Sequence, residues 1–261
     1  MSYSKKFTGG VKLKPGIKRY PFWFVRHGAT LANGSVGKLE DDAKLFEAQG
    51  ASSNGVRNLL TEFGKKQGFS CGLALPDDEI TTAICSTQPR ALQTAFYAKA
   101  FDKWKVLLLK NIKERDFKLL EGTMLPTKAF QGPWPGTQDP TLLSKLVVEL
   151  VLEFYTQIEG VVWFSHGGIL GLIGGVLGVV LCPEHRKNGY TIRFDPPADP
   201  NDGEWTYTVL APPIKPGDID IATLNKECSS STWQSLLEKL EIPLNAIPEE
   251  MFKLLEQLSV D

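Results

Sequence analysis

The sequence lacks an excess of charge of either sign. Its 261 residues include 29 Lys and Arg against 30 Asp and Glu, which gives a net charge of −1 and a pI near 6.3. Proteins that bind nucleic acids or membrane surfaces need a clustered positive face. This balance therefore argues against both functions, and any anion chemistry must be confined to a local site.

Cysteine and histidine are also scarce. The 4 cysteines form no CxxC pair, which argues against a redox or zinc motif and predicts reduced thiols in a cytoplasmic compartment. The 3 histidines have no clustered cysteines or carboxylates beside them in the sequence, so no metal is expected. No cofactor is implied either.

A long uninterrupted hydrophobic segment is missing as well. Residues 1–20 contain basic side chains but not the apolar core of a secretory signal, so no targeting segment is expected. The most hydrophobic stretch, 161–182, contains a histidine and several glycines. These residues favour a buried strand, a turn and a buried helix over a membrane span.

The stretch around which the chain is organised is 22–33, FWFVRHGATLAN. Phe22–Val25 has the composition of a buried strand, and that strand stops at Arg26-His27-Gly28. In open α/β sheets ligands bind at the carboxyl ends of strands, and a glycine there permits close approach. His27 beside Arg26 is thus placed to act on an anion, although a structural histidine is the simpler explanation of the tripeptide alone.

A second apolar strand, 161–164, ends in the same way, at Ser165-His166-Gly167-Gly168. Two of the 3 histidines therefore follow predicted strands. The glycine-rich residues beyond the second histidine predict a helix from about Ile169 to Leu181 that packs closely on the sheet and is ended by Pro183.

Further strands and helices alternate along the chain. Residues 80–86 and 106–109 are predicted strands, and apolar residues at helical spacing predict a helix over 140–154. A helix opens at Pro89-Arg90 and continues to about residue 100. Arg90 then lies where helix N-terminal donors favour an anion, although a surface salt bridge is the simpler local explanation.

This alternation predicts an α/β fold, a three-layer sandwich in which helices flank a mostly parallel central sheet. The segments 190–194 and 204–210 follow Asn-Gly and Asp-Gly turns and alternate apolar with polar residues. They are expected to form an antiparallel hairpin at one edge of the sheet. Two short amphipathic patterns, 233–240 and 249–258, predict a short helical C-terminal tail.

The ordered set of motifs resembles the histidine phosphatase superfamily, also called phosphoglycerate-mutase-like, and specifically its phosphatase branch. The motifs are Arg26-His27-Gly28 with Thr30 and Asn33, Leu60-Thr61 with Gly64 and Gln67, Ser86 with Arg90 and Gln93-Thr94-Ala95, Glu114, and Ser165-His166-Gly167-Gly168. Each motif is unspecific alone, but their order is specific. The resemblance covers about residues 20–212, which predicts an N-terminal extension over 1–19, a catalytic domain over 20–212 and a C-terminal helical extension over 213–261.

The resemblance implies a role for each matched residue. His27 would attack phosphorus through a neutral ring nitrogen and form a phosphohistidine that water hydrolyses. Arg26, Arg90 and His166 would supply positive charge around the phosphoryl oxygens, because such catalysis is mostly positioning and fixed charge. Glu114 would protonate the leaving oxygen.

Three further positions match the phosphate pocket of relatives: Thr30, Asn33 and the backbone amide of Gly167. Asp116 is a weaker candidate than Glu114 for the general acid. Lys118 stands where the family usually has a glycine, which leaves the direction of Glu114 open.

Details of the motifs favour hydrolysis of a phosphomonoester. Gly168-Ile169 follows the second His-Gly, as in many phosphatases, where mutases usually carry Asn-Ser. Mutase-type transfer, favoured by 114–117, and an inactive relative that binds phosphorylated ligands or proteins are the alternatives. The expected substrate is a phosphorylated small molecule or a phosphoprotein, with specificity set by loops 34–58 and 122–138. The oligomeric state is not indicated.

Overall fold

A mixed six-stranded sheet forms the centre of the computed structural model, which describes residues 13–30, 59–109, 112, 140–201 and 204–228. The strand order is β3-β2-β4-β1-β5-β6. The strands are β1 (Phe22–Arg26), β2 (Thr82–Ser86), β3 (Lys105–Leu109), β4 (Val161–Ser165), β5 (Thr191–Asp195) and β6 (Thr206–Leu210). The helices are α2 (Glu62–Ala74), α3 (Pro89–Tyr97), α4 (Ala100–Lys103), α5 (Pro140–Tyr155), α6 (Gly167–Leu177) and α7 (Ile221–Glu227), with short 3-10 turns at Pro183–Arg186 and Pro216–Asp218.

The first four strands are parallel, and the last two are not. β1 and β2 each pair with β4 in parallel, and β3 pairs with β2 in the same sense. β5 runs antiparallel to β1, and β6 antiparallel to β5. The expected mostly parallel sheet with an edge hairpin is therefore confirmed, and the carboxyl ends of β1, β2 and β4 lie at the same edge.

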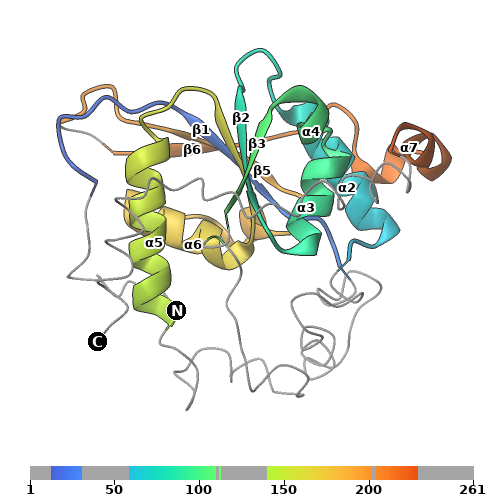
Figure 1. Ribbon diagram of the computed structural model, residues 1–261, viewed down its shortest axis with the longest axis horizontal. Coiled ribbons are helices and arrows are strands. Elements are labelled where there is room, and N and C mark those ends of the chain that lie inside the picture. Colours follow the sequence, from blue (N-terminus) through green and yellow to red (C-terminus); the bar gives the residue numbers. More distant parts are fainter. Residues whose placement is uncertain (1–12, 31–58, 110–111, 113–139, 202–203, 229–261) are drawn as a thin grey trace.

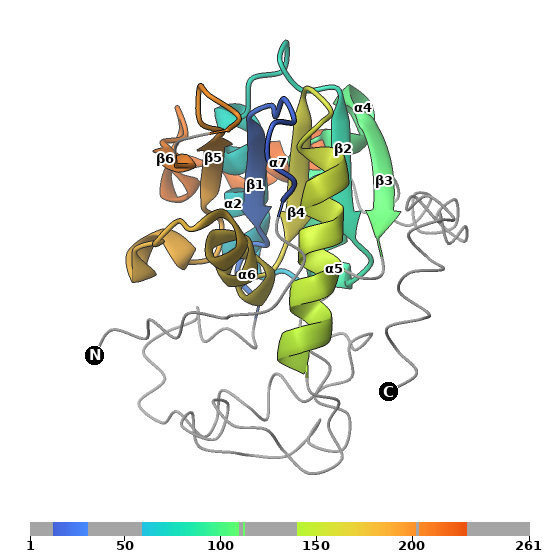
Figure 2. The same ribbon diagram turned by 90° about the vertical axis from the view of Figure 1, so that its left-hand side faces the viewer.

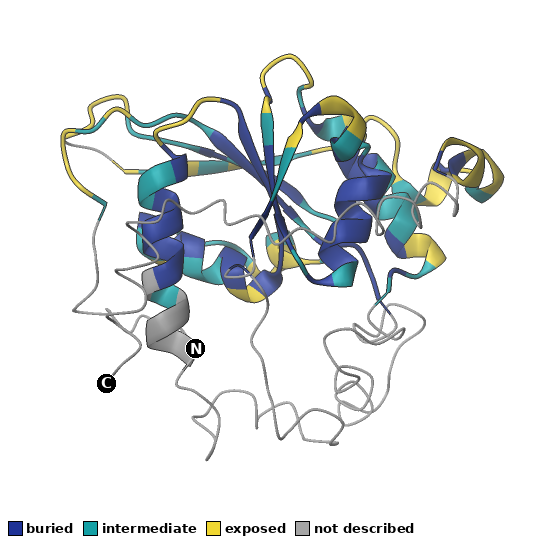
Figure 3. Ribbon diagram, in the orientation of Figure 1, coloured by how far each residue is buried: buried dark blue, intermediate teal, exposed yellow. Residues whose placement is uncertain are grey.

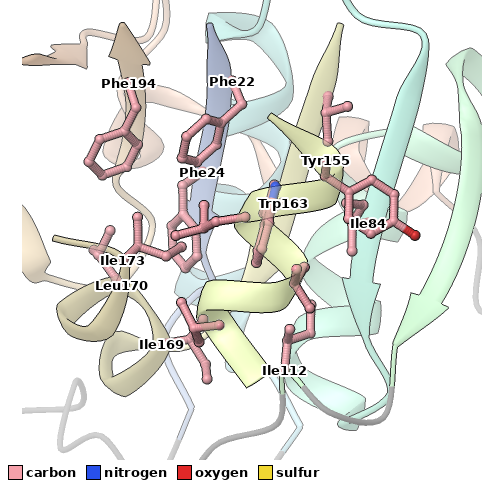
Figure 4. Close-up of a cluster of buried hydrophobic side chains, with 14 of the residues drawn as sticks. Phe22, Phe24, Ile84, Ile112, Tyr155, Trp163, Ile169, Leu170, Ile173 and Phe194 are labelled. Carbon is pink, nitrogen blue, oxygen red and sulfur yellow. The ribbon is translucent and has the colours of Figure 1, made fainter. Parts of the chain in front are cut away.

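Helices cover both faces of the sheet, which gives the three layers (Figures 1 and 2). Side chains of β1 alternate between the faces, as a strand requires. Phe22 and Phe24 pack with α5 and α6 in one core cluster, whereas Trp23 and Val25 pack with α2 and α3 in the other. Figure 4 shows the first cluster, in which Phe22 and Phe24 lie beside Trp163 of β4.

Burial is greatest in the central strands, as Figure 3 shows. The four side chains from Phe22 to Val25 are at most 2% exposed. Full burial of a large apolar side chain stabilises a fold by about 1.5–3 kcal/mol, so β1 contributes strongly to the core. None of the helices in the described part of the chain has both the length and the hydrophobicity that a bilayer crossing requires.

Two helices end earlier than the sequence predicts, and one helix was not predicted. α6 ends at Leu177 rather than at Leu181, because Gly178 adopts the left-handed conformation and the amide of Val179 bonds to the carbonyl of Gly174. The helix expected to reach about residue 100 stops at Tyr97, and Lys99, with φ of 59°, separates α3 from α4. α7 was not predicted, and the tail helices expected over 233–240 and 249–258 lie outside the described residues.

A backbone contact fixes the turn after β1 against α2. A Cβ added to Gly28 would lie 2.3 Å from the carbonyl oxygen of Gly64, and a Cβ added to Gly64 would lie 2.1 Å from the carbonyl oxygen of Ala29. Any side chain at either position would force the two backbones apart. Thr61 caps the same helix, because its side chain accepts a hydrogen bond from the amide of Gly64.

We expect Gly64→Ala to lower the free energy of unfolding by about 1–3 kcal/mol, the usual cost of overpacking. Gly175→Ala is the matched control in α6, because its Cβ would meet no atom of the described residues within 4 Å. The control should gain about 0.5–1 kcal/mol from helix propensity. Urea denaturation measures both, and a Gly64→Ala protein as stable as the wild type would contradict the contact.

Candidate active site

The two histidines that follow strands meet at the carboxyl edge of the sheet. His27 comes directly after β1, and His166 comes directly after β4 as the N-cap of α6. The amide of His27 donates to the carbonyl of Ser165, 2.9 Å away, which keeps the two strand ends in register. The ring centroids lie 5.2 Å apart with 57° between the ring planes. The expected convergence of the two imidazoles is therefore present.

Arg90 joins this pair from α3, which follows β2. Its Nε–H group donates to Nε2 of His27 over 3.2 Å, and its Nη2 donates to the side-chain oxygen of Gln88 over 3.1 Å. Arg90 is only 8% exposed, so its charge lies within the protein, next to the imidazole. The simpler explanation of Arg90 as a surface salt bridge does not hold.

The partners of His27 identify its tautomer. Nδ1 lies 2.8 Å from the carbonyl oxygen of Gly28, which can only accept a hydrogen bond, so Nδ1 carries the proton. Nε2 then keeps its lone pair, which accepts from the Arg90 donor. The side-chain amide of Asn188 donates to the carbonyl of His27 over 2.9 Å and holds the same turn. His27 thus has a neutral ring with an oriented basic nitrogen.

His166 has a hydrogen-bond partner at one ring nitrogen and none at the other within the described structure. The hydroxyl oxygen of Ser86 accepts from the amide of Gln88 over 3.3 Å and lies 2.8 Å from Nε2 of His166. A hydroxyl group can accept two hydrogen bonds and donate one, so this contact is compatible with either neutral tautomer of His166. Nδ1 of His166 is buried and has no hydrogen-bond partner in the described structure. An unsatisfied buried polar group costs about 1–3 kcal/mol, and in the tautomer with the proton on Nδ1 an anion placed before this nitrogen would relieve that cost.

Burial and charge keep both rings neutral. Burial is the largest cause that lowers the pKa of His27 well below its usual 6.5, followed by the charges of Arg90 and Arg26, while the bond to Gly28 opposes the shift. Burial also lowers the pKa of His166 most, with Arg90 next. The exposed fractions of the two rings are 2% and 0%. A neutral ring is the form that can act as a nucleophile.

Arg26 lies against the first turn of α6. A Cβ on Gly167 would lie 2.9 Å from the guanidinium carbon of Arg26, so only glycine permits this contact. Nη1 of Arg26 donates to the backbone carbonyl of Arg186. Gly167 is the first residue of α6, and its amide is among the donors that a helix leaves without an internal partner.

The remaining predicted site residues are Thr30, Asn33 and the two candidate acids. Thr30 is fully buried and forms an isolated bridge with Leu60, which ties the loop after β1 to the start of α2. Asn33, Glu114 and Asp116 lie outside the described residues, so their roles stay predictions. His185, expected at the surface, is half-buried, and its Nδ1 lies 3.1 Å from the hydroxyl of Tyr207.

A second layer of polar side chains fixes the turn after β1. Thr94 accepts from the amide of Gly28 over 2.9 Å, and Gln67 accepts from the amide of Ala29 over 2.8 Å. Gln67 also donates to the carbonyl of Asn188 over 2.8 Å. Sequence reasoning matched Gln67 and Thr94 to motifs but gave them no role. The available signal was their place in two of the matched motifs, Gly64 with Gln67 and Gln93-Thr94-Ala95.

No three His, Cys, Asp or Glu side chains gather as a metal site requires within the ranges that the structure describes. The site as described therefore consists of two neutral imidazoles and two guanidinium groups around one position. This arrangement can hold an anion and present a nucleophilic nitrogen to it.

Folding lowers the pKa of both histidines. Below pH 6.5 the two imidazoles therefore bind protons in the unfolded chain but stay neutral in the native protein. Stability should be unaffected by these groups above that pH and should fall as the pH decreases below it, with a limiting slope of about 2.7 kcal/mol per pH unit for two groups. Denaturant unfolding between pH 7.5 and 5 measures the slope. His166→Gln should roughly halve it, and a flat wild-type profile would contradict the burial of neutral rings.

Comparison with known proteins finds a matching protein family and similar solved structures. The family model described as "Histidine phosphatase superfamily (branch 1)" matches residues 22–178. The crystal structure of TTHB049 from Thermus thermophilus superposes with a TM-score of 0.50 at 25% identity, covering 73% of this chain and 99% of that one. The structure of phosphoserine phosphatase from Entamoeba histolytica with 3-phosphoglyceric acid gives 0.52 at 21% identity, covering 74% and 98%.

Two curated relatives are both named agropine synthesis reductase, from Rhizobium rhizogenes. They are 35% and 32% identical to this chain over 198 and 197 residues. The match covers 74% of this chain but only 43% and 42% of the relatives, so the chain spans less than half of their length. The family match extends over more than half of the chain and includes β1, β4 and both strand-His-Gly turns. The chain therefore belongs to the histidine phosphatase superfamily, branch 1.

Proposed function

We propose that this protein is a phosphatase that hydrolyses a phosphomonoester through a phosphohistidine on His27. The single observation that carries the proposal is the neutral, oriented Nε2 of His27 beside the guanidinium of Arg90. Membership of the superfamily supports phosphoryl transfer in general. The substrate class we propose is a phosphorylated small molecule, in a protein of the cytoplasm.

Binding of the phosphate would free the nucleophile. Without an anion, the lone pair of His27 Nε2 accepts the Nε–H group of Arg90. A phosphoryl group between the two residues gives Arg90 stronger acceptors, since a guanidinium binds phosphate oxygens in pairs. The lone pair then faces phosphorus. Arg26 from β1 and His166, in the tautomer that carries the proton on Nδ1, would complete the set around the same oxygens.

Each chemical step balances in atoms and charge. The Nε2 lone pair forms a bond to phosphorus while the bond from phosphorus to the leaving oxygen breaks, and that oxygen takes a proton from Glu114. Water next attacks the phosphohistidine, gives a proton to Glu114, and the bond between phosphorus and nitrogen breaks. Inorganic phosphate leaves and neutral His27 is restored. Arg26 and Arg90 hold the negative charge of the equatorial oxygens throughout.

The curated relatives are named reductases, but we do not propose a reductase function for this chain. A dinucleotide site begins with a glycine-rich turn after the first strand. Here β1 runs into Arg26-His27-Gly28 instead, and the chain matches less than half of each relative. Mutase-type transfer depends on residues 114–117, which lie outside the described residues.

His27→Ala should lower kcat for p-nitrophenyl phosphate by about a thousandfold or more, because the covalent route is lost. His185→Ala is the matched control, since it removes an imidazole whose polar contact is Tyr207. Rapid acid-free quenching of the wild type with labelled substrate should trap phosphorus on His27. Retained activity in pure His27→Ala protein would overturn the nucleophile.

Glu114→Gln tests the proposed general acid. Loss of the proton donor should slow esters with poor leaving groups, such as alkyl phosphates, by about 10²–10⁴-fold. Aryl phosphates with good leaving groups need no proton and should be slowed far less in the cleavage step. Single-turnover kinetics separates that step from later hydrolysis. If both ester classes slowed equally, while Asp116→Asn showed the selective loss, the acid would be Asp116.

A further inference from the structure

Two guanidinium groups lie along one glycine-lined face of α6. The Cβ position of Gly167 lies 2.9 Å from Cζ of Arg26, and the Cβ position of Gly171 lies 2.9 Å from Nη2 of Arg186. Residues four apart on a helix are neighbours on one face, about 5–6 Å from each other. The Arg186 guanidinium is therefore about one helical turn from that of Arg26.

The backbone of Arg186 is already part of the site. Its carbonyl accepts the Nη1 donor of Arg26, and Asn188, two residues on, donates to the carbonyl of His27. The 3-10 turn Pro183–Arg186 thus ends beside the proposed phosphate position. The Arg186 side chain is close enough for a small substrate to reach both the phosphate position and its guanidinium.

The charge of Arg186 is not neutralised within the described residues. Arg19 pairs with Glu153 and Arg193 with Asp195, each at 2.8 Å. No described carboxylate pairs with Arg186, including Glu184 two positions before it. The residue is exposed. Packing over Gly171 alone does not require a charged side chain. An exposed guanidinium at this position is suited to bind an anion from solvent.

We propose that Arg186 binds a second anionic group of the substrate, a carboxylate or a second phosphate, next to the phosphoryl group that is transferred. The planar fork of arginine binds either group through two parallel hydrogen bonds. This inference rests on the proposed phosphatase function and narrows it. The substrate is a small phosphomonoester with a second negative charge a few bonds away from the first.

The test compares substrates that differ in one group. Glycerol 3-phosphate and 3-phosphoglycerate differ in a hydroxymethyl group against a carboxylate, and glycerol 1,3-bisphosphate carries a second phosphate instead. The wild type should prefer at least one of the two doubly charged esters. Arg186→Gln should lower that preference in kcat/KM by about 10- to 100-fold, mainly through KM, because a charged hydrogen-bond pair is lost.

Lys187→Gln is the matched control, because it removes the same charge from the next exposed residue. It should keep the preference of the wild type. Gly171→Ala is a second variant that retains Arg186, since the atoms of described residues that the new Cβ would meet within 4 Å are Nη2 and Cζ of Arg186. By displacing the guanidinium it should weaken the preference in the same direction. The ester that shows the effect identifies the second anion as carboxylate or phosphate.

Equal losses on all three esters in Arg186→Gln, or the same loss in Lys187→Gln, would overturn the inference and leave the phosphatase proposal intact. The phosphatase proposal would fail instead if the wild type hydrolysed neither the three esters nor p-nitrophenyl phosphate. Calorimetric titration then measures binding independently of catalysis. The ligands 3-phosphoglycerate, glycerol 3-phosphate and glycerol 1,3-bisphosphate are titrated into wild-type and Arg186→Gln protein, and their affinities show whether Arg186 selects the doubly charged ligand. Equal affinity for all three in both proteins would end the inference there too.

Discussion

The hydrogen bond from Arg90 to His27 is the interaction on which the site depends. Burial is the largest cause that lowers the pKa of His27, and the fixed positive charge of Arg90 beside the imidazole acts in the same direction. The residue that lowers the basicity of the nucleophile is thus also the residue suited to hold the anion it attacks. An arginine serves both purposes because its own charge does not titrate in the working range of pH.

Sheet topology makes this contact possible between residues that are far apart in the sequence. Parallel pairing brings the ends of β1, β2 and β4 to one edge, and each strand runs into a turn that carries part of the site. The antiparallel hairpin contributes from the other side, because Asn188 and Arg186 precede β5. Residues from the strand ends and from the segment before the hairpin therefore meet around His27.

Sequence reasoning predicted those features that arise from local patterns. The two strand-His-Gly turns, the parallel sheet and the proline-started helix that holds Arg90 each follow from a few adjacent residues. The sequence prediction placed the end of α6 too late, at Leu181, because apolar residues continue to that position. The left-handed conformation of Gly178 ends the helix earlier. The prediction gave no role to Asn188 or Arg186, since a residue in a turn acquires one only when the fold places His27 or Gly171 against it.

The paired glycines at 28 and 64 restrict how this site can change in evolution. Their contact is between main chains, so neither position tolerates a side chain unless α2 or the nucleophile turn moves. A single substitution cannot be offset by shortening a neighbouring side chain, because no side chain is there to shorten. Descendants of this sequence can therefore vary the groups that select a substrate much more freely than they can vary the position of the nucleophile turn.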